Sequence, residues 1–376
     1  MSHPFDRLIV HHLRGLKDLE LTGLGQVNLL VGGNDSGKTT VLEALALLSA
    51  PLSPGTWIRT AGRREPTMAM ARARPTTMEQ LRWLFPQQAS ALKDALYEGT
   101  ASFSAEGASP LKAVSARYKE VEGIQIEGSK PGNEDALRPD REEGGERLGA
   151  EIRIQAMQKK PEEATPTALD TSFTIWEGDS TRLFPGMSRT GLPLRMISPH
   201  DHRTNSIFLR EFSDARMSGL QESVRELLRA IDPRITGLEI LAPRGITMLF
   251  LQDSVAGLAP LSAFGDGIRR ALLMALAIPS LKGGVLLIDE LETAIHVSAL
   301  TKLFQWLVNA CKQYNVQLFA TTHSLEAVDA VLGADTTAEE DVVGYRLERT
   351  EGRSVVKRFG EGMLKRLRYE RGLDVR

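Results

Sequence analysis

The chain has 376 residues, of which 42% are hydrophobic and 25% charged, and its 46 Lys and Arg nearly balance 48 Asp and Glu. This balance excludes a uniformly basic coat for nucleic acid, although it permits a local basic patch. Cys311 is the single cysteine, so an internal disulfide framework and a CxxC metal or redox motif are excluded as well. We expect a globular protein of a reducing compartment, and therefore a cytoplasmic one.

No segment has the length and apolarity of a membrane anchor. The first residues lack the apolar stretch of a signal peptide. The longest charge-free apolar run, residues 271–281, is far shorter than the ~20 residues that cross a bilayer. We therefore expect no membrane partner.

The N-terminal part begins with short β-type segments at 8–10, 19–21 and 27–31. The third is apolar enough for a central strand that is buried on both faces. It runs into glycines, and from Lys38 apolar residues recur at helical spacing until Pro51. The opening is thus a strand, a loop and a helix.

The middle of the chain, 56–236, carries no motif that assigns it, and we expect an inserted α+β lobe there. A helix is expected around 78–85, and strand-like segments within 101–121 and 151–184. Between those strands, about 128–147, six of twenty residues are Gly or Pro among mixed charges, which is typical of a mobile loop.

The second half alternates helices with strands, which indicates a parallel sheet. The expected elements are a helix at 224–231, strands at 237–241 and 246–251, a helix at 268–278, a strand at 285–288, a helix at 298–313 and a strand at 317–320. A hairpin of 342–347 with 354–359 precedes a short basic helix and tail. The core is expected over 1–55 and 237–341, with 342–376 as a C-terminal appendage.

Residues 32–39, GGNDSGKT, fit G-x-x-x-x-G-K-[ST] between the buried strand and the helix. The glycines let backbone N–H groups turn towards phosphate oxygens, and the helix N-terminus adds its positive dipole end. Lys38 is expected at the β- and γ-phosphates of ATP and Thr39 on Mg²⁺. The expected nucleotide-binding residues are Gly32, Gly33, Asn34, Asp35, Ser36, Gly37, Lys38, Thr39 and Thr40.

Two further strand ends carry the remaining chemistry. The strand 285–288 runs into Asp289, a second magnesium ligand, and Glu290, which is placed to orient or deprotonate water. His323 follows the next strand, where ligands gather in parallel sheets, and it can sense the γ-phosphate; a purely structural histidine is the alternative. The expected catalytic residues are thus Lys38, Glu290 and His323.

These motifs together resemble the ABC-class, AAA-type P-loop ATPases of the RecF, SMC and overcoming-lysogenization-defect group. The resemblance implies an α/β fold, namely a P-loop NTPase with an ABC-ATPase head, a mixed sheet and an inserted lobe. It also implies that Arg14 lies near the nucleotide and that two heads sandwich two ATP molecules. The matching segments are LRGLK at 13–17, the loop at 32–39, LEA at 42–44, IDE at 288–290 and THS at 322–324.

The family's signature loop precedes the Asp-Glu strand and contacts the γ-phosphate of the partner head. Residues 261–270 occupy that place, with Gly265 where the signature has serine if Gly267 is its glycine. Ser262 is the candidate for the displaced hydroxyl. We expect Ser262, Gly265 and Gly267 to contact nucleotide through a hydroxyl, backbone N–H groups and the helix dipole. The alternative is a glycine-rich helix start that only packs.

The sequence motifs do not decide which process the ATPase controls. The residues after His323 are too few for the nuclease domain of many relatives, and the tail resembles that of stand-alone members. The resemblance implies head dimerisation that controls a separately encoded nuclease or toxin in anti-phage defence. One alternative is a RecF-like DNA-repair role, with residues 59–74 or the basic C-terminal segment on DNA. Another is a nucleotide switch or scaffold without hydrolysis.

Two other features favour structural roles. His200, Asp201 and His202 lack further ligands at metal-binding spacing, which favours a loop. The four tryptophans, at 57, 83, 176 and 306, show no stacking pattern and are expected in the core.

Overall fold

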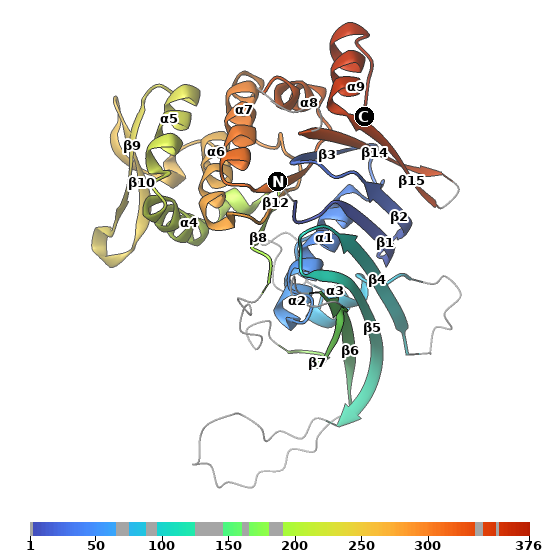
Figure 1. Cartoon of the computed structure of the whole chain (residues 1–376). Helices are drawn as coiled ribbons and strands as arrows, with labels where there is room; N and C mark the ends of the chain where they lie inside the picture. The colour runs from blue at the N-terminus through green and yellow to red at the C-terminus, as the bar shows by residue number, and fades with distance from the viewer. Residues whose placement is uncertain are drawn as a thin grey trace, which may run out of the picture.

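The computed structural model describes residues 3–64, 75–87, 96–124, 146–159, 165–179, 191–334, 341–350 and 353–376. Residues 128–145 of the expected mobile loop at 128–147, and residues 65–74 of the candidate DNA-binding segment 59–74, lie outside these ranges. Within them, two six-stranded sheets and one three-stranded sheet form the frame (Figure 1).

The central sheet has the order β15-β14-β3-β13-β12-β8. Its strands β8, β12, β13, β3 and β14 are parallel, and β15 runs antiparallel to β14, so the expected mixed sheet is confirmed. Every residue of β3, β12 and β13 is buried, as their apolar sequences predict. The bounds are β3 Val27–Val31, β8 Leu194–Ile197, β12 Val285–Ile288, β13 Gln317–Thr321, β14 Val342–Thr350 and β15 Arg353–Gly360.

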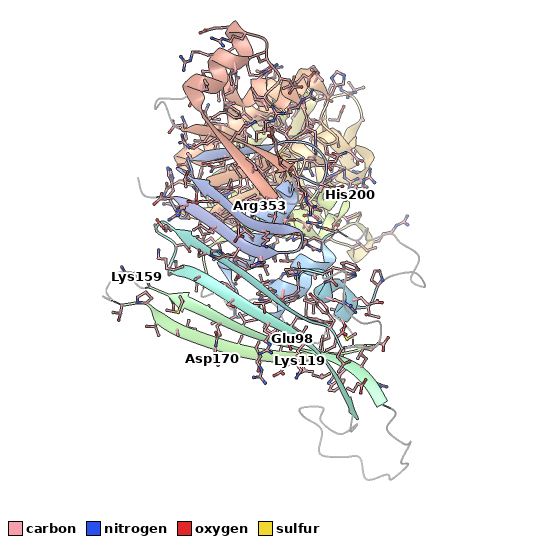
Figure 2. The ribbon with its side chains drawn as sticks, turned by 90° about the vertical axis from the view of Figure 1, so that its right-hand side faces the viewer. Glu98, Lys119, Lys159, Asp170, His200 and Arg353 are labelled. Atoms are coloured by element: carbon pink, nitrogen blue, oxygen red, sulfur yellow. The ribbon has the colours of Figure 1, made fainter. Side chains whose placement is uncertain are left out.

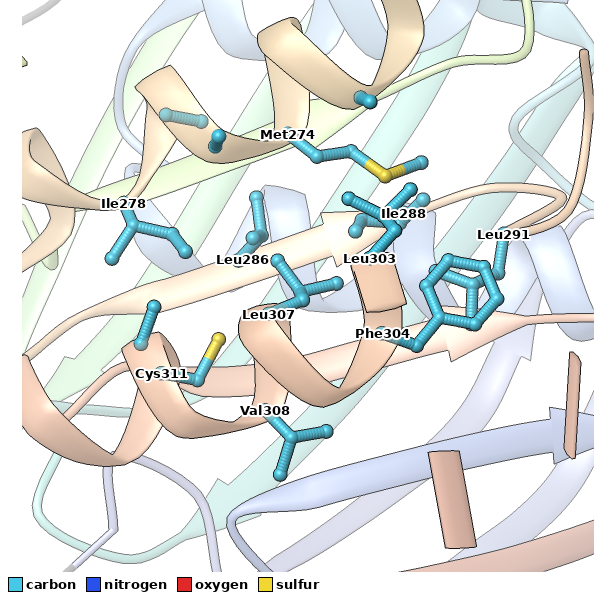
Figure 3. Close-up of a cluster of buried hydrophobic side chains, with 14 of the residues drawn as sticks. Met274, Ile278, Leu286, Ile288, Leu291, Leu303, Phe304, Leu307, Val308 and Cys311 are labelled. Carbon is cyan, nitrogen blue, oxygen red and sulfur yellow. The ribbon is translucent and has the colours of Figure 1, made fainter. Parts of the chain in front are cut away.

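The two faces of this sheet belong to two different cores. In β12, Leu286 and Ile288 join a cluster with the helices of the second half, and Figure 3 shows them against Met274 and Leu303. Val285 and Leu287 point to the other cluster, because side chains alternate along a strand. The helices of the first cluster are α4 Asn205–Met217, α5 Gln221–Ile231, α6 Asp266–Ala277, α7 Val297–Gln313 and α8 Leu325–Leu332.

The second cluster lies between the central sheet and an antiparallel sheet of order β2-β1-β4-β5-β6-β7. Three helices, α1 Lys38–Ser49, α2 Pro54–Gly62 and α3 Thr77–Arg82, contribute buried residues to it. Figure 2 labels Glu98, Lys119 and Asp170 on this sheet. The strands are β1 Arg7–Leu13, β2 Leu16–Thr22, β4 Glu98–Glu106, β5 Leu111–Ile124, β6 Glu146–Gln158 and β7 Thr167–Trp176.

The region of the expected inserted lobe, 56–236, is connected through strands and helices to the regions on either side of it. Strand β4 pairs with β1 of the N-terminal part, and β8 pairs with β12 of the central sheet. Helices α4 and α5 share their hydrophobic cluster with α6 and α7. The sequence pattern could not show this, because the apolar face of a strand does not reveal which partner covers it.

A small sheet of β9 Ile235–Leu241, β10 Met248–Asp253 and β11 Gly257–Pro260 extends beyond α4 and α5 (Figure 1). The expected C-terminal hairpin is formed by β14 and β15, followed by α9 Glu361–Lys365 and the π-helix η7 Arg366–Glu370. The other short helices in the part of the chain that the structure describes are η3 Asp201–Arg203, η4 Pro243–Gly245, η5 Leu261–Ala263 and η6 Pro279–Leu281. In the described ranges, no helix combines the length and apolarity needed to cross a membrane.

The tryptophans give a matched test of the second cluster. Trp57 is fully buried, stacks on Phe85 at 6.1 Å between ring centroids and donates its Nε1–H to the carbonyl of Pro51 at 2.7 Å. The expectation of a core residue is wrong for Trp83, which is 58% exposed.

We expect Trp57→Ala to lower the free energy of unfolding by about 3–5 kcal/mol, since it leaves a large cavity. Trp83→Ala should change it by less than about 0.5 kcal/mol. Urea unfolding followed by circular dichroism measures both variants. Equal losses of unfolding free energy in the two variants would contradict a buried Trp57 and an exposed Trp83.

Candidate nucleotide-binding site

The loop between β3 and α1 requires glycine at two positions. Gly32 and Gly37 have φ angles of 135° and 97°, which disfavour any side chain. A Cβ at Gly32 would collide with the carbonyl oxygen of Leu347, and one at Gly37 with the side chain of Leu16. The loop is therefore shaped by its neighbours β14 and β2 as well as by its own sequence.

A cavity of about 580 Å³ opens beside this loop. Its size lies in the usual range of small-ligand pockets. The strand ends of β12 and β13, the turn between β1 and β2, and the hairpin β14–β15 complete the wall. The lining residues are Arg14, Gly15, Leu16, Asn34, Asp35, Ser36, Gly37, Lys38, Thr39, Thr40, Arg64, Asp289, Glu290, Thr321, His323, Arg349 and Ser354.

The ammonium of Lys38 lies inside the loop. Its Nζ donates hydrogen bonds to the carbonyls of Gly32 at 2.9 Å and Gly33 at 2.8 Å, and the residue is 6% exposed. Burial lowers the pKa of Lys38, while Asp289 acts in the opposite direction. Gly32 and Gly33 thus do not line the cavity but hold the cation next to it.

Asp289 is joined to both neighbouring strand ends through threonine hydroxyls. Thr39 Oγ1 lies 3.1 and 3.2 Å from its two carboxylate oxygens, and Thr321 Oγ1 donates to Oδ1 at 2.7 Å. Burial raises the pKa of Asp289, and the bonds from Thr321 and Thr39 partly offset this. The carboxylate and hydroxyl oxygens of Asp289 and Thr39 are the hard donors that suit Mg²⁺.

The Thr321 hydroxyl orders both acidic residues at once. Besides donating to Asp289, its oxygen accepts the backbone N–H of Glu290 at 2.8 Å. Glu290 has a φ of 51°, a costly conformation for a residue with a side chain, and its Oε2 accepts from Thr293 at 2.7 Å. Thr321 was not identified from the sequence; its position at a strand end, one strand from Asp289, was the available signal.

His323 lines the cavity from a loop that Glu292 braces. One carboxylate oxygen of Glu292 accepts the His323 backbone N–H at 2.9 Å, and the other accepts the Thr322 hydroxyl at 2.7 Å. The expected switch residue is therefore tied to the segment that follows Asp289 and Glu290.

Arg270 is a second residue that sequence reasoning missed. It is fully buried, and its guanidinium donates to the carbonyls of Ser198 at 2.6 Å and of Asp289 and Glu290 at 2.8 Å each. Burial lowers the pKa of Arg270 to about 10. The side chain links α6 to the end of β12; its position directly before the apolar run 271–277 of the helix was the available signal.

Arg14 lies at the cavity wall as expected, but its charge is shared with Glu43. The fully buried Glu43 carboxylate accepts from Arg14 Nε at 2.7 Å and Nη2 at 3.0 Å. Arg64 donates to the same carboxylate at 2.8 and 2.9 Å and to Thr40 Oγ1 at 2.9 Å. Arg349 of the hairpin is a further lining cation that the sequence did not indicate.

The signature-loop residues lie outside this cavity. Gly265 is the N-cap of α6, and Ser262 borders a smaller hollow of about 170 Å³. A Cβ at Gly267 would come within 2.9 Å of the carbonyl oxygen of Ala294, so this glycine permits close packing. The contact of Ser262, Gly265 and Gly267 with nucleotide thus stays a prediction. It would have to be made with the nucleotide of a second copy of the chain.

Asp201 and His202 belong to the short 3-10 helix η3, and His200 directly precedes it. Asp201 accepts hydrogen bonds from the backbone and hydroxyl of Ser198, and His202 is buried 3.4 Å from Asp266. Across the part of the chain that the structure describes, no group of three or more His, Cys, Asp or Glu is arranged to hold a metal ion.

The raised pKa of Asp289 has a consequence for stability. The folded chain binds this proton more tightly than the unfolded chain, so folding stability falls as pH rises from the unfolded-state pKa through the folded-state pKa. Above that range the ionised, buried Asp289 carboxylate opposes folding.

We expect Asp289→Asn to raise the melting temperature at pH 7 without divalent cation and to weaken the decline between acidic and neutral pH. The variant should also lose the extra stabilisation that Mg²⁺ with ATP confers over ATP with EDTA. Thermal melts check both effects, with the exposed Asp170→Asn as the matched control. A lower melting temperature, or an intact Mg²⁺ effect, would contradict the assignment.

Comparison with known proteins finds a family model and several relatives that match parts of the chain. A family model described as "AAA domain, putative AbiEii toxin, Type IV TA system" matches residues 178–329. An uncharacterized protein of Methanocaldococcus jannaschii is 35% identical over 114 residues, which are 30% of this chain and 98% of the relative.

Two named relatives match shorter segments. An ATP/GTP phosphatase of Helicobacter pylori is 36% identical over 73 residues, 19% of this chain and 20% of the relative. The DNA replication and repair protein RecF of a Marinomonas species is 50% identical over 46 residues, 12% of each chain.

A solved structure of an SMC head bound to the C-terminal winged-helix domain of ScpA covers 95% of this chain and 98% of its own, with a TM-score of 0.48 and 12% identity. The chain belongs to the P-loop ATPases of the ABC class, in the group that contains the RecF, SMC and overcoming-lysogenization-defect proteins.

Proposed function

We propose that the protein binds ATP with Mg²⁺ and hydrolyses it in a dimer of two heads. One observation carries this proposal: Lys38, Thr39, Asp289, Glu290 and His323, which come from three separate parts of the sequence, line one cavity. An ATP/GTP phosphatase among the relatives supports hydrolysis as the reaction.

Each residue has a definite task in this reaction. The loop N–H groups and Lys38 bind the phosphates, while Thr39 and Asp289 hold Mg²⁺. The metal neutralises charge on the phosphate oxygens. Glu290 accepts a proton from the attacking water, and His323 donates a hydrogen bond to the γ-phosphate.

The second head completes the site in this proposal. Ser262 and the N-terminus of α6 at Gly265 and Gly267 lie outside their own chain's cavity, and Gly265 has no neighbouring atom within 4 Å of a built Cβ. A helix N-terminus with free N–H groups is a site for anions. We therefore place it on the γ-phosphate of the partner, so that hydrolysis separates the heads.

The output that we propose is control of a separately encoded effector, a nuclease or toxin, in defence against phage. The description of the matching family names a toxin of a type IV toxin–antitoxin system, which supports this choice. The RecF relatives align with this chain over 46 residues or fewer. Such short alignments support the ATPase core but do not support a RecF-like role of the whole protein.

For hydrolysis, we expect Lys38→Ala to lose ATP binding and Glu290→Gln to keep binding while turnover falls at least about 10²-fold. Phosphate release and equilibrium binding of ATP measure the two effects separately. The exposed Glu239→Gln, far from the cavity, is the matched control and should behave as the parent protein.

Turnover of Glu290→Gln at the parent rate would remove the role given to Glu290. No phosphate release by the parent protein above Lys38→Ala would favour a switch without hydrolysis. Strong stimulation of turnover by duplex DNA, lost steeply with added salt, would favour the DNA-repair role instead.

For dimerisation, we expect Glu290→Gln to shift from monomer to dimer in Mg²⁺ and ATP, and to stay monomeric in ADP. The trapped γ-phosphate is the group that α6 of the partner would bind. Light scattering during size exclusion measures the mass. A mass that is independent of nucleotide would overturn the role given to Gly265 and Gly267.

A further inference from the structure

The C-terminal segment 366–376 folds back onto the body of the protein (Figure 1). After η7, the backbone N–H of Leu373 donates to the carbonyl of Leu367 at 2.9 Å. Val375 is 2% exposed and belongs to the hydrophobic cluster of the second-half helices. The segment is therefore packed in place, although several of its side chains face solvent.

A polar anchor fixes the segment to α8, the helix that follows His323. Arg368 Nε and Nη2 donate to both carboxylate oxygens of Asp329 at 2.7 and 2.8 Å, a bidentate pair whose arginine side chain is 11% exposed. Arg368 Nη1 also donates to the carbonyl of Leu373 at 2.7 Å, and Tyr369 OH to the carbonyl of Asp329 at 3.1 Å.

Arg376 extends from this anchored segment to the nucleotide site. Its Nη1 donates to the carbonyl oxygen of His323 at 2.8 Å. Asp374 orients the guanidinium by accepting from Nε at 3.1 Å and from Nη2 at 2.8 Å. The same carboxylate accepts the backbone N–H of Arg376 at 2.9 Å.

His323 is thus held from both sides by charged groups. Glu292 accepts its backbone N–H at 2.9 Å, and Arg376 donates to its carbonyl. Both are charge-assisted bonds, which are shorter and stronger than neutral ones. With the N–H and the carbonyl both held, the backbone of His323 has little freedom at a position that lines the cavity.

We propose that Arg376 is a positioning residue for His323: through the His323 carbonyl, the C-terminal segment sets the orientation of the histidine towards the γ-phosphate. The expected effect on turnover rests on the proposed ATP hydrolysis. The expected effect on the His323 backbone does not. Displacement of the segment from α8 would release the His323 carbonyl and slow turnover without removing any group that touches the nucleotide.

The kinetic test compares Arg376→Ala, Arg376→Lys and the control Arg371→Ala, whose exposed arginine lies in the same segment. We expect Arg376→Ala to lower kcat about tenfold with the KM for ATP within twofold, because the histidine loses its orientation while the phosphate loop is intact. Arg376→Lys keeps a donor for the carbonyl and should recover more than half of the lost kcat. Arg371→Ala should match the parent protein.

The structural test uses the full chain without nucleotide. Hydrogen exchange of the amides at 322–325 should be at least about threefold faster in Arg376→Ala than in Arg371→Ala, with equal melting temperatures. Parent turnover no higher than that of Lys38→Ala would overturn the proposed hydrolysis, and the exchange result would still decide the positioning role. If Arg376→Ala and Arg371→Ala had the same kcat and the same hydrogen exchange at 322–325, the positioning role of Arg376 would be overturned. A lower melting temperature of Arg376→Ala that Arg376→Lys does not restore would also overturn the positioning role.

Discussion

The site depends on one constraint, the parallel register of β3, β13 and β12. Leu30 pairs with Thr321, and Ala320 pairs with Ile288, so the three strands end at the same edge of the sheet. The phosphate loop, the His323 loop and the acidic pair therefore emerge side by side. Both faces of these strands are buried, and a slip of one residue would exchange the two faces between the two hydrophobic clusters.

Buried charged and polar groups around the cavity each bind more than one partner. Glu43 receives two arginines, Arg270 donates to three carbonyls, and Thr321 connects Asp289 with the backbone of Glu290. An unpaired buried charge is costly, so these networks hold the surrounding strands and helices in a single arrangement. Their preorganisation supports the proposed ATP hydrolysis, because that reaction depends on positioning and electrostatics more than on covalent chemistry.

Much of the central sheet could be predicted from the sequence because its signals are local. The apolar run at 27–31, the glycines at 32 and 37, and the strand ending at Asp289 each carry their own pattern. The helix α2, the strand β8 and the pairing of β4 with β1 were not predicted, since short or half-buried segments give weak periodicity. Trp83 was expected in the core and is exposed, because hydrophobicity alone does not place a side chain.

The sequence by itself determined the P-loop motif of the chain and its acidic strand end, because both are recognisable from residue type and spacing over a few positions. The tertiary structure alone decided which distant groups support that chemistry. Thr321, Arg270, Arg349 and Arg376 reach the site or its loops from separate elements, through pairing and packing over long sequence distances. Such contacts leave no local pattern, since each depends on where two folded segments meet.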